Sequence, residues 1–122
     1  MSELGRRDLL QASILLYLRT GAVDEEDLIS WLREPEAGAN PPRATRRQLR
    51  AFERVGLVRS SWQAASYRPT HRRYWITTKG IVSLARRSDV IAAAHREVHE
   101  FLERYARVSN ENLLPQNEKL LV

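Results

Sequence analysis

The most constraining feature of this 122-residue chain is one long helical pattern between Lys79 and Arg107. Apolar side chains recur there at alternating spacings of three and four residues, sustained over more than three heptads, which is the pattern of a coiled-coil seam. A helix of this length measures roughly 43 Å at 1.5 Å per residue, which is more than the small body preceding it can cover. The pattern therefore predicts a long helix, 79–107, that pairs with a second copy of the chain. The seam positions are Ile81, Leu84, Ser88, Ile91, His95, Val98, Leu102 and Tyr105.

Alternatively, the apolar seam of residues 79–107 packs against residues 6–19 of the same chain. They contain no helix breaker, and their leucines and isoleucine surround most of a helix, so this helix must be packed on most sides. If residues 79–107 packed entirely against it, no partner would be needed. Because the seam is much longer than this segment, we favour a homodimer.

Two histidines lie on the long helix. His95 is in the seam, close to the expected two-fold axis, and we hypothesise that its protonation weakens the dimer. A dimer fraction that sedimentation finds unchanged on acidification would disprove this. His99 follows four residues later, a spacing that can seat a metal, but the chain has no cysteine and no third convergent ligand. We therefore expect no metal site and no cofactor.

Positive charge is concentrated in one stretch. Residues 43–73 hold nine arginines and a single acid, Glu53, whereas residues 1–42 hold four arginines and eight acids. A surface with one sign of charge destabilises the compact protein through self-repulsion, so it points to a polyanionic partner. Each arginine alone would be an ordinary solvated charge, but the cluster favours nucleic acid.

Two more helices are expected between the helix at residues 6–19 and the long helix at residues 79–107. Asp24 predicts an N-cap for a helix that ends near Arg33, with a short strand just before it. Residues 34–42 are a polar loop rich in helix breakers. A third helix then extends from Pro42 to a stop at Gly56. The residues expected on the core faces are Leu28, Ile29 and Leu32 of the second helix, and Leu49, Phe52 and Val55 of the third.

A hairpin is expected after the third helix. Residues 57–63 and 71–77 alternate as strands do, and residues 64–70 contain the proline and small polar residues of a hairpin tip. The residues expected to face the core are Val58 and Ile76, and Thr77 or Thr78 is expected to cap the long helix.

This order of elements resembles the winged-helix fold of the MarR and PadR families of bacterial and archaeal transcription regulators. Two segments show this resemblance. RRQLRAFERVGLVRS is similar to a recognition helix that continues into the first wing strand, and RRYWITTKGIVSL is similar to a second wing strand that continues into a helix. The resemblance covers residues 6–107. It implies a mainly α fold with a small β-wing (winged helix-turn-helix) plus a long C-terminal dimerisation helix. It also implies a homodimer whose recognition helices enter successive major grooves of a pseudo-palindromic site.

In such a fold the outer face of the third helix meets base edges, and the wing meets the backbone or minor groove. The candidates on the helix are Arg46, Arg47 and Arg50 for the major groove, Thr45 for a phosphate or a thymine methyl, and Arg43 for a phosphate at the helix N-terminus. The candidates in the wing are Arg68, expected at the tip, Thr70, His71, Arg72 and Arg73. About five or six phosphate contacts per chain would make binding strongly salt dependent.

The three tryptophans, Trp31, Trp62 and Trp75, also admit a ligand-pocket interpretation, because regulators of the resembled families bind small aromatic effectors between the dimer helix and the body. Packing in the core or wing is favoured, because large aromatic residues dominate small cores without any ligand. No residue supports a particular small-molecule effector, and none is named.

Other classes of protein are disfavoured by what the chain lacks. No glycine-rich phosphate loop, nucleophile elbow or pair of carboxylates in a plausible cleft is present, so catalysis is not expected. No apolar run approaches the roughly 18 residues that cross a bilayer, and the first residues lack a signal-peptide core. We expect a soluble, cytoplasmic protein that does not engage membranes.

The sequence therefore predicts a sequence-specific, double-stranded DNA-binding homodimer, specifically a transcriptional repressor. Residues 1–78 are the expected DNA-binding domain, 79–107 the dimerisation helix, and 108–122 a loose or partner-docked tail. Two alternatives stay open. One is a plasmid or viral partition or replication factor of the same fold, and the other is a winged-helix module whose basic face binds an acidic protein.

Overall fold

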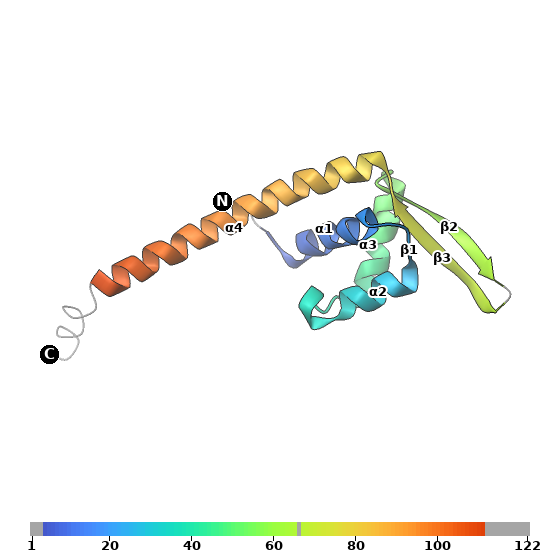
Figure 1. The fold of residues 1–122 in the computed structure, drawn as a ribbon, viewed down its shortest axis with the longest axis horizontal. Coiled ribbons are helices and arrows are strands. Elements are labelled where there is room, and N and C mark those ends of the chain that lie inside the picture. Colours follow the sequence, from blue (N-terminus) through green and yellow to red (C-terminus); the bar gives the residue numbers. More distant parts are fainter. Residues whose placement is uncertain (1–3, 66, 112–122) are drawn as a thin grey trace.

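The computed structural model describes residues 4–65 and 67–111. The elements in chain order are α1 (Arg6–Arg19), β1 (Val23–Asp24), α2 (Glu25–Arg33), the 3-10 helix η1 (Pro35–Ala37), α3 (Pro42–Arg54), β2 (Val58–Ala65), β3 (Arg68–Ile76) and α4 (Thr78–Glu111). The three shorter helices lie beside the first half of α4, and the β2–β3 hairpin projects away from them (Figure 1). This is the predicted fold class, mainly helical with a β-wing and a long C-terminal helix.

The core lies where α1, α2, α3 and the sheet meet. α1 is central to it and contacts α2, α3, α4 and β3, so the expectation that this helix is covered on most sides is confirmed. Two of its leucines, Leu9 and Leu16, stay about half exposed. The fully buried side chains are Ile14, Leu15, Leu18, Leu28, Leu32, Thr45, Leu49, Val58 and Tyr74.

The core faces of α2 and α3 follow the predicted periodicity with one exception. Val55 was expected to face the core together with Leu49 and Phe52, but it is 54% exposed. α3 ends at Arg54, and the chain reverses through Gly56, which has a φ of 80°. Val55 therefore lies outside the helical repeat that would have turned it inward.

The polar loop between α2 and α3 is held in place by Asn40. This residue is almost completely buried, and its backbone N–H donates to Leu32 O at 2.8 Å. Its side-chain amide donates to Ala37 O at 2.9 Å. The loop therefore sets the start of α3 relative to the end of α2.

The sheet is antiparallel with the strand order β1–β3–β2. Its hairpin is longer than predicted, because β2 and β3 continue until Ala65 pairs with Arg68. Most of the segment 64–70, expected to be the hairpin tip, is therefore strand. Pro69 falls in the irregular part of the ladder, where a proline removes no regular backbone hydrogen bond.

The start of α4 is set by Thr77, one of the two residues predicted to cap it. Its Oγ1 accepts a hydrogen bond from the Gly80 N–H at 3.1 Å and lies 2.6 Å from Gly56 O. Gly80 itself passes very close to the preceding turn, because a Cβ on this residue would lie 2.2 Å from Leu57 O. The cap and the glycine together let α4 leave the sheet directly across the end of α3.

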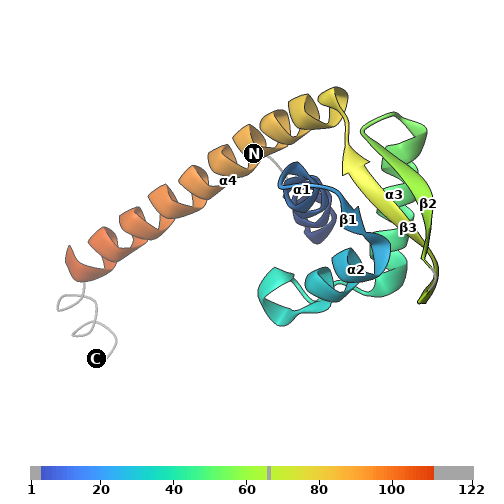
Figure 2. The same cartoon turned by 45° about the vertical axis from the view of Figure 1, so that its right-hand side comes forward.

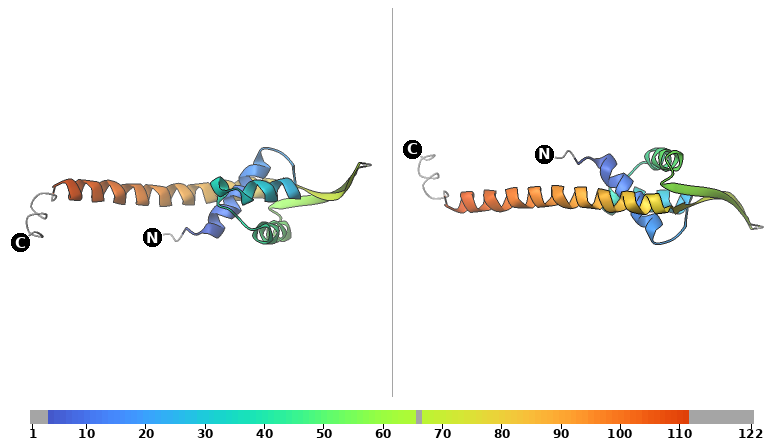
Figure 3. Two further views of the ribbon diagram at one scale, coloured as in Figure 1. Left: turned by 90° about the horizontal axis from the view of Figure 1, so that it is seen from below. Right: turned by 90° about the horizontal axis from the view of Figure 1, so that it is seen from above.

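α4 continues far beyond the body. Leu84 packs against the core and Ala94 is buried, but every residue from His95 to Val108 is exposed. The views from below and from above show this second half of the helix extending away from the other elements (Figure 3). Within the part of the chain that the structure describes, no helix is both long enough and apolar enough to cross a membrane.

Candidate nucleic-acid and dimer interfaces

α3 divides its side chains between a buried face and a basic face. Leu49 and Phe52 lie in the core. The arginines occupy roughly 100° of the opposite circumference at 3.6 residues per turn. They line one open groove on the surface, formed by Arg43, Arg46, Arg47, Arg50 and Arg54. The four α3 arginines assigned to DNA from the sequence are thus brought together, and Arg54 joins them.

Thr45 does not belong to the basic face. It is fully buried, and its Oγ1 has no hydrogen-bond partner among the residues described. The prediction that Thr45 contacts a phosphate or a thymine methyl is therefore wrong. Thr45 precedes Leu49 by four residues and Phe52 by seven, so helical periodicity places it on the core face.

The arginines of this face are largely free of acidic partners. Arg46 Nη2 lies 3.8 Å from Glu26 Oε1 of α2, but both side chains are well exposed, and such a pair contributes little to stability. Within residues 4–65 and 67–111, Arg43, Arg47 and Arg50 have no carboxylate within ion-pair distance. The face therefore presents an uncompensated positive charge to solvent.

Two further arginines extend this surface, and no local sequence pattern indicates them. Arg6 and Arg7 at the start of α1 line a second groove together with Arg47 and Arg54 of α3. Arg6 Nη2 also donates to Gly38 O at 2.8 Å, which holds it against the loop before α3. These two arginines belong to an acid-rich segment, and only the packing of α1 on α3 places them here.

On one face of the wing, His71 and Arg73 turn toward the body. Arg73 is directly opposite Asp24 in the β1–β3 ladder, and its Nε donates to Asp24 Oδ1 at 2.9 Å. His71 Nε2 lies 3.5 Å from the same oxygen, and its side chain is only 14% exposed. The prediction that His71 contacts DNA does not fit this position. Asp24 occupies the predicted N-cap position of α2, but its side chain makes no cap hydrogen bond.

On the other face of the wing, Arg72 is also engaged. Its Nε donates to Ser60 Oγ at 3.0 Å, and its Nη2 lies 4.0 Å from Glu53 Oε1 of α3. Its guanidinium carbon lies 5.1 Å from the centroid of the Trp62 ring. Arg72 is therefore tied to α3 and β2, so the free cation expected from the sequence is not found at this position.

The outer part of the hairpin contains the two remaining predicted DNA-contact residues of the wing, Arg68 and Thr70. Thr70 is exposed, as a contact residue must be. Arg68 begins β3 and pairs with Ala65, and its side chain lies outside the described residues. Its predicted role as the tip residue remains a prediction.

The tryptophans do not form the core. Trp62 lies in the wing against the Arg72 guanidinium, but 63% of it remains exposed. Trp31 and Trp75 are partly exposed, and the Trp31 ring lies 5.4 Å from that of Tyr17. The large aromatic residues in the core are instead Phe52 and Tyr74.

The seam of α4 is divided between the body and solvent. Leu84 packs against the core and Ile91 is half buried, so the chain itself already covers part of the predicted interface. The exposed seam residues are Ile81, Ser88, His95, Val98, Leu102 and Tyr105. The intrachain alternative, in which the whole seam packs against residues 6–19, is thus wrong: within the described chain the body covers only Leu84 and part of Ile91.

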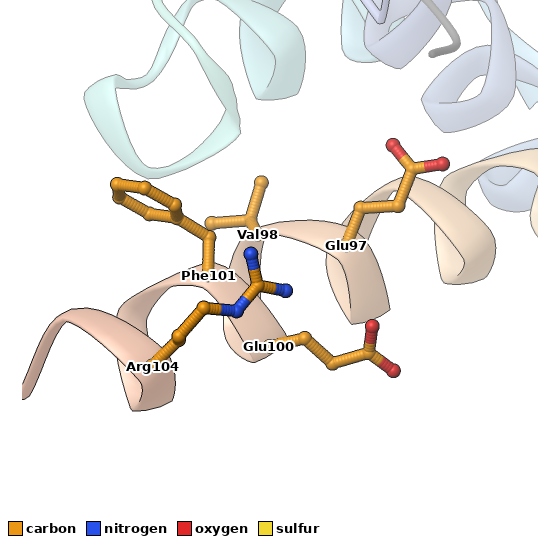
Figure 4. A pocket seen from close by; sticks show the side chains of 5 residues that line it. All are labelled: Glu97, Val98, Glu100, Phe101 and Arg104. Atoms are coloured by element: carbon orange, nitrogen blue, oxygen red, sulfur yellow. The ribbon is translucent and has the colours of Figure 1, made fainter. Parts of the chain in front are cut away.

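Phe101 adds to the exposed seam, although the sequence pattern omitted it. It lines a hollow on α4 with Val98, and the charged residues around them are Glu97, Glu100 and Arg104. Val98 and Phe101 point to the same side of the helix (Figure 4). Because all five residues come from one helix, this hollow has no opposite wall in the described structure.

Comparisons with known proteins agree on the architecture. No protein-family model and no curated protein matches the sequence. Among solved structures, Bacillus subtilis PadR in complex with operator DNA is 19% identical, with a TM-score of 0.57 over 62% of this chain and 44% of that one. This chain therefore spans less than half the length of that protein.

Two other solved structures match more of the fold. The PadR-like transcriptional regulator BC4206 from Bacillus cereus is 20% identical, with a TM-score of 0.67 over 77% of this chain and 91% of that one. TM0937, described as a potential transcriptional factor, is 23% identical, with a TM-score of 0.71 over 88% of this chain and 97% of that one. The predicted resemblance is confirmed at the level of the fold: the chain is a winged helix similar in structure to PadR-like transcriptional regulators.

Proposed function

We propose that this chain binds double-stranded DNA as a homodimer and represses transcription by occupying an operator. The observation that carries the proposal is the uncompensated arginine face of α3 on a winged-helix fold. The solved structure of B. subtilis PadR, which shares this fold, is a complex with operator DNA. In winged-helix proteins this helix enters the major groove, so its exposed face is the one that meets the bases.

Within this function the α3 arginines have distinct roles. Arg46, Arg47 and Arg50 lie midway along the helix and meet base edges and flanking phosphates, because the guanidinium fork fits both guanine and phosphate oxygens. Arg43 lies in the first turn, where the helix dipole also favours a phosphate. Arg7 extends the phosphate contacts to α1, which lengthens the surface along the DNA backbone.

Homodimer formation is supported by the exposed half of α4. Val98, Phe101, Leu102 and Tyr105 are each between 55% and 63% exposed. An apolar strip of this kind on an isolated helix marks an interaction surface. Its heptad spacing fits a copy of the same helix, which would also bring two α3 helices to one DNA site. Leu9 and Leu16 of α1 supply a second apolar strip for the same partner.

The proposal is tested by selecting duplexes from a random pool and measuring the affinity for the winning sequence by fluorescence anisotropy across a salt series. We expect log Kd to be linear in log salt, because phosphate contacts release counterions. The variant Arg46→Ala/Arg47→Ala/Arg50→Ala should bind at least about 100-fold more weakly, at roughly 1–3 kcal/mol per contact.

A control variant loses the same charge elsewhere. Arg19, Arg33 and Arg86 are exposed and lie outside both arginine-lined grooves, so their replacement by alanine should change affinity by less than about tenfold. Equal losses for the two variants would show that only net charge matters and would contradict the assignment to α3. Failure to enrich any duplex would contradict DNA binding itself.

A further inference from the structure

The wing carries a large apolar ring that the fold leaves in water. Trp62 lies in β2 directly opposite Arg72 of β3, so their side chains share one face of the hairpin. The Arg72 guanidinium lies over the indole, with 5.1 Å between its central carbon and the ring centroid. Trp62 nevertheless remains 63% exposed. A fixed and exposed indole is a contact surface, since its burial by a partner would remove a large apolar area from water.

The face that bears Trp62 is the face that meets α3. Ser60, two residues before Trp62, donates from its Oγ to Glu53 Oε2 of α3 at 2.7 Å. Arg72 contacts the same two residues, through Ser60 Oγ at 3.0 Å and Glu53 Oε1 at 4.0 Å. β2 contacts α3 (Figure 2). Trp62 is therefore on the α3 side of the wing, farther out along the hairpin.

Glu53, the single acid of residues 43–73, has a structural role in the wing. It lies between the core face and the arginine face of α3, beside the wing. Its carboxylate joins Ser60 and Arg72 and so fixes the wing relative to α3. Because its Nε donates to Ser60 and its Nη2 faces Glu53, the Arg72 guanidinium is held against the indole and acts as a positioning group.

We propose that Trp62 is a DNA contact of the wing, whose indole packs against the sugar–phosphate backbone of the duplex held by α3. This inference rests on the proposed function. The ring offers apolar area to the deoxyribose and one N–H donor to a phosphate oxygen, which is the chemistry of a backbone contact. Trp75, three residues after Arg72, lies on the opposite face of the sheet and should remain away from the duplex.

The test uses three single-tryptophan proteins, in which two of Trp31, Trp62 and Trp75 are replaced by phenylalanine. Each protein is titrated with its selected duplex, and anisotropy of the labelled DNA confirms saturation. Acrylamide quenching of the remaining tryptophan is then compared with and without DNA. We expect the quenching constant of the Trp62-only protein to fall at least about twofold, and those of the Trp31-only and Trp75-only proteins to stay unchanged.

Affinity provides the second measurement. Trp62→Ala should weaken duplex binding roughly tenfold, whereas Trp62→Phe, which keeps a ring, should stay within about threefold of the wild type. Trp75→Ala is the matched control and should not change affinity. If saturating duplex leaves Trp62 as accessible to acrylamide as before, the inference is overturned while the proposed function stands. If no duplex binds, both fail.

Discussion

Asp24 and Arg73 form an ion pair across the β1–β3 ladder, with 2.9 Å between Asp24 Oδ1 and Arg73 Nε. Asp24 is only 5% exposed and directly precedes α2, while Arg73 lies in the central strand of the sheet. The pair therefore ties the start of α2 to the base of the wing. Because α3 packs against both α2 and β2, this link also helps to set the position of the arginine face of α3.

Replacing Arg73 should affect stability more than DNA affinity. In Arg73→Met the nearly buried Asp24 carboxylate loses its closest cation, and we expect the free energy of unfolding to fall by about 1–3 kcal/mol in urea titrations. Arg59→Met, an exposed arginine of β2, should change it by less than about 0.5 kcal/mol. An unfolding midpoint for Arg73→Met equal to that of the wild type would rule out this structural role.

Gly80→Ala should be among the most destabilising single substitutions. The new Cβ would lie 2.2 Å from Leu57 O and 2.6 Å from Ile76 Cγ1, so α4 must shift away from the preceding turn. We expect a loss of at least about 3 kcal/mol in thermal or urea unfolding. Thr77→Ala removes the neighbouring cap and the hydroxyl's contacts with Gly56 O and Leu57 O, and should lose about 1–2 kcal/mol. A smaller loss for Gly80→Ala than for Thr77→Ala would refute the close approach.

The stability of the protein should fall at alkaline pH partly through Tyr74. Burial, together with the nearby Glu25 carboxylate, raises the pKa of the Tyr74 phenol above its ordinary value of 10.0. The unfolded chain therefore releases this proton first as pH rises. The stabilisation from the neutral phenol is complete below pH 10.0 and is lost as pH rises through the folded-state pKa.

Tyr74→Phe tests this. The phenol oxygen has no hydrogen-bond partner among the described residues, so its removal should leave stability at neutral pH unchanged or raise it by about 1 kcal/mol. The alkaline loss of stability should become shallower in urea titrations across the pH series. Tyr67→Phe, at the exposed end of the hairpin, is the control for loss of a phenol. Superimposable pH profiles for wild type and Tyr74→Phe would count against the buried phenol.

Leu102→Glu should convert the proposed homodimer into a monomer. Leu102 is 55% exposed and lies in the half of α4 that the body does not cover, so its substitution disturbs no intrachain packing. A carboxylate there would be buried beside its own copy in the paired helices, which is strongly unfavourable. Sedimentation velocity should show a lower sedimentation coefficient with unchanged helicity. Arg107→Glu, off the seam, should stay dimeric, and a dimeric Leu102→Glu would refute the α4 interface.

Local patterns alone located most of the elements. The helix expected at residues 6–19 is α1, Arg6–Arg19, and the cap expected at Thr77 starts α4. Both depend on residues close together in sequence, through apolar periodicity and capping chemistry. Thr45 was misassigned although the same periodicity places it in the core. The strands of the hairpin are longer than predicted. Pro69 and the small residues near it are typical of a turn, but here they lie in an irregular part of the β2–β3 pairing.

The sequence by itself determined that a basic helix, a hairpin and a long heptad helix follow one another. Tertiary structure alone decided which charges are free and which apolar residues are covered. Arg72 and Arg73 are held by Glu53 and Asp24, whereas Arg7 joins the α3 surface. The physical reason is range: helical period and capping act over a few residues, whereas ion pairing and burial depend on strand register and helix packing between distant segments.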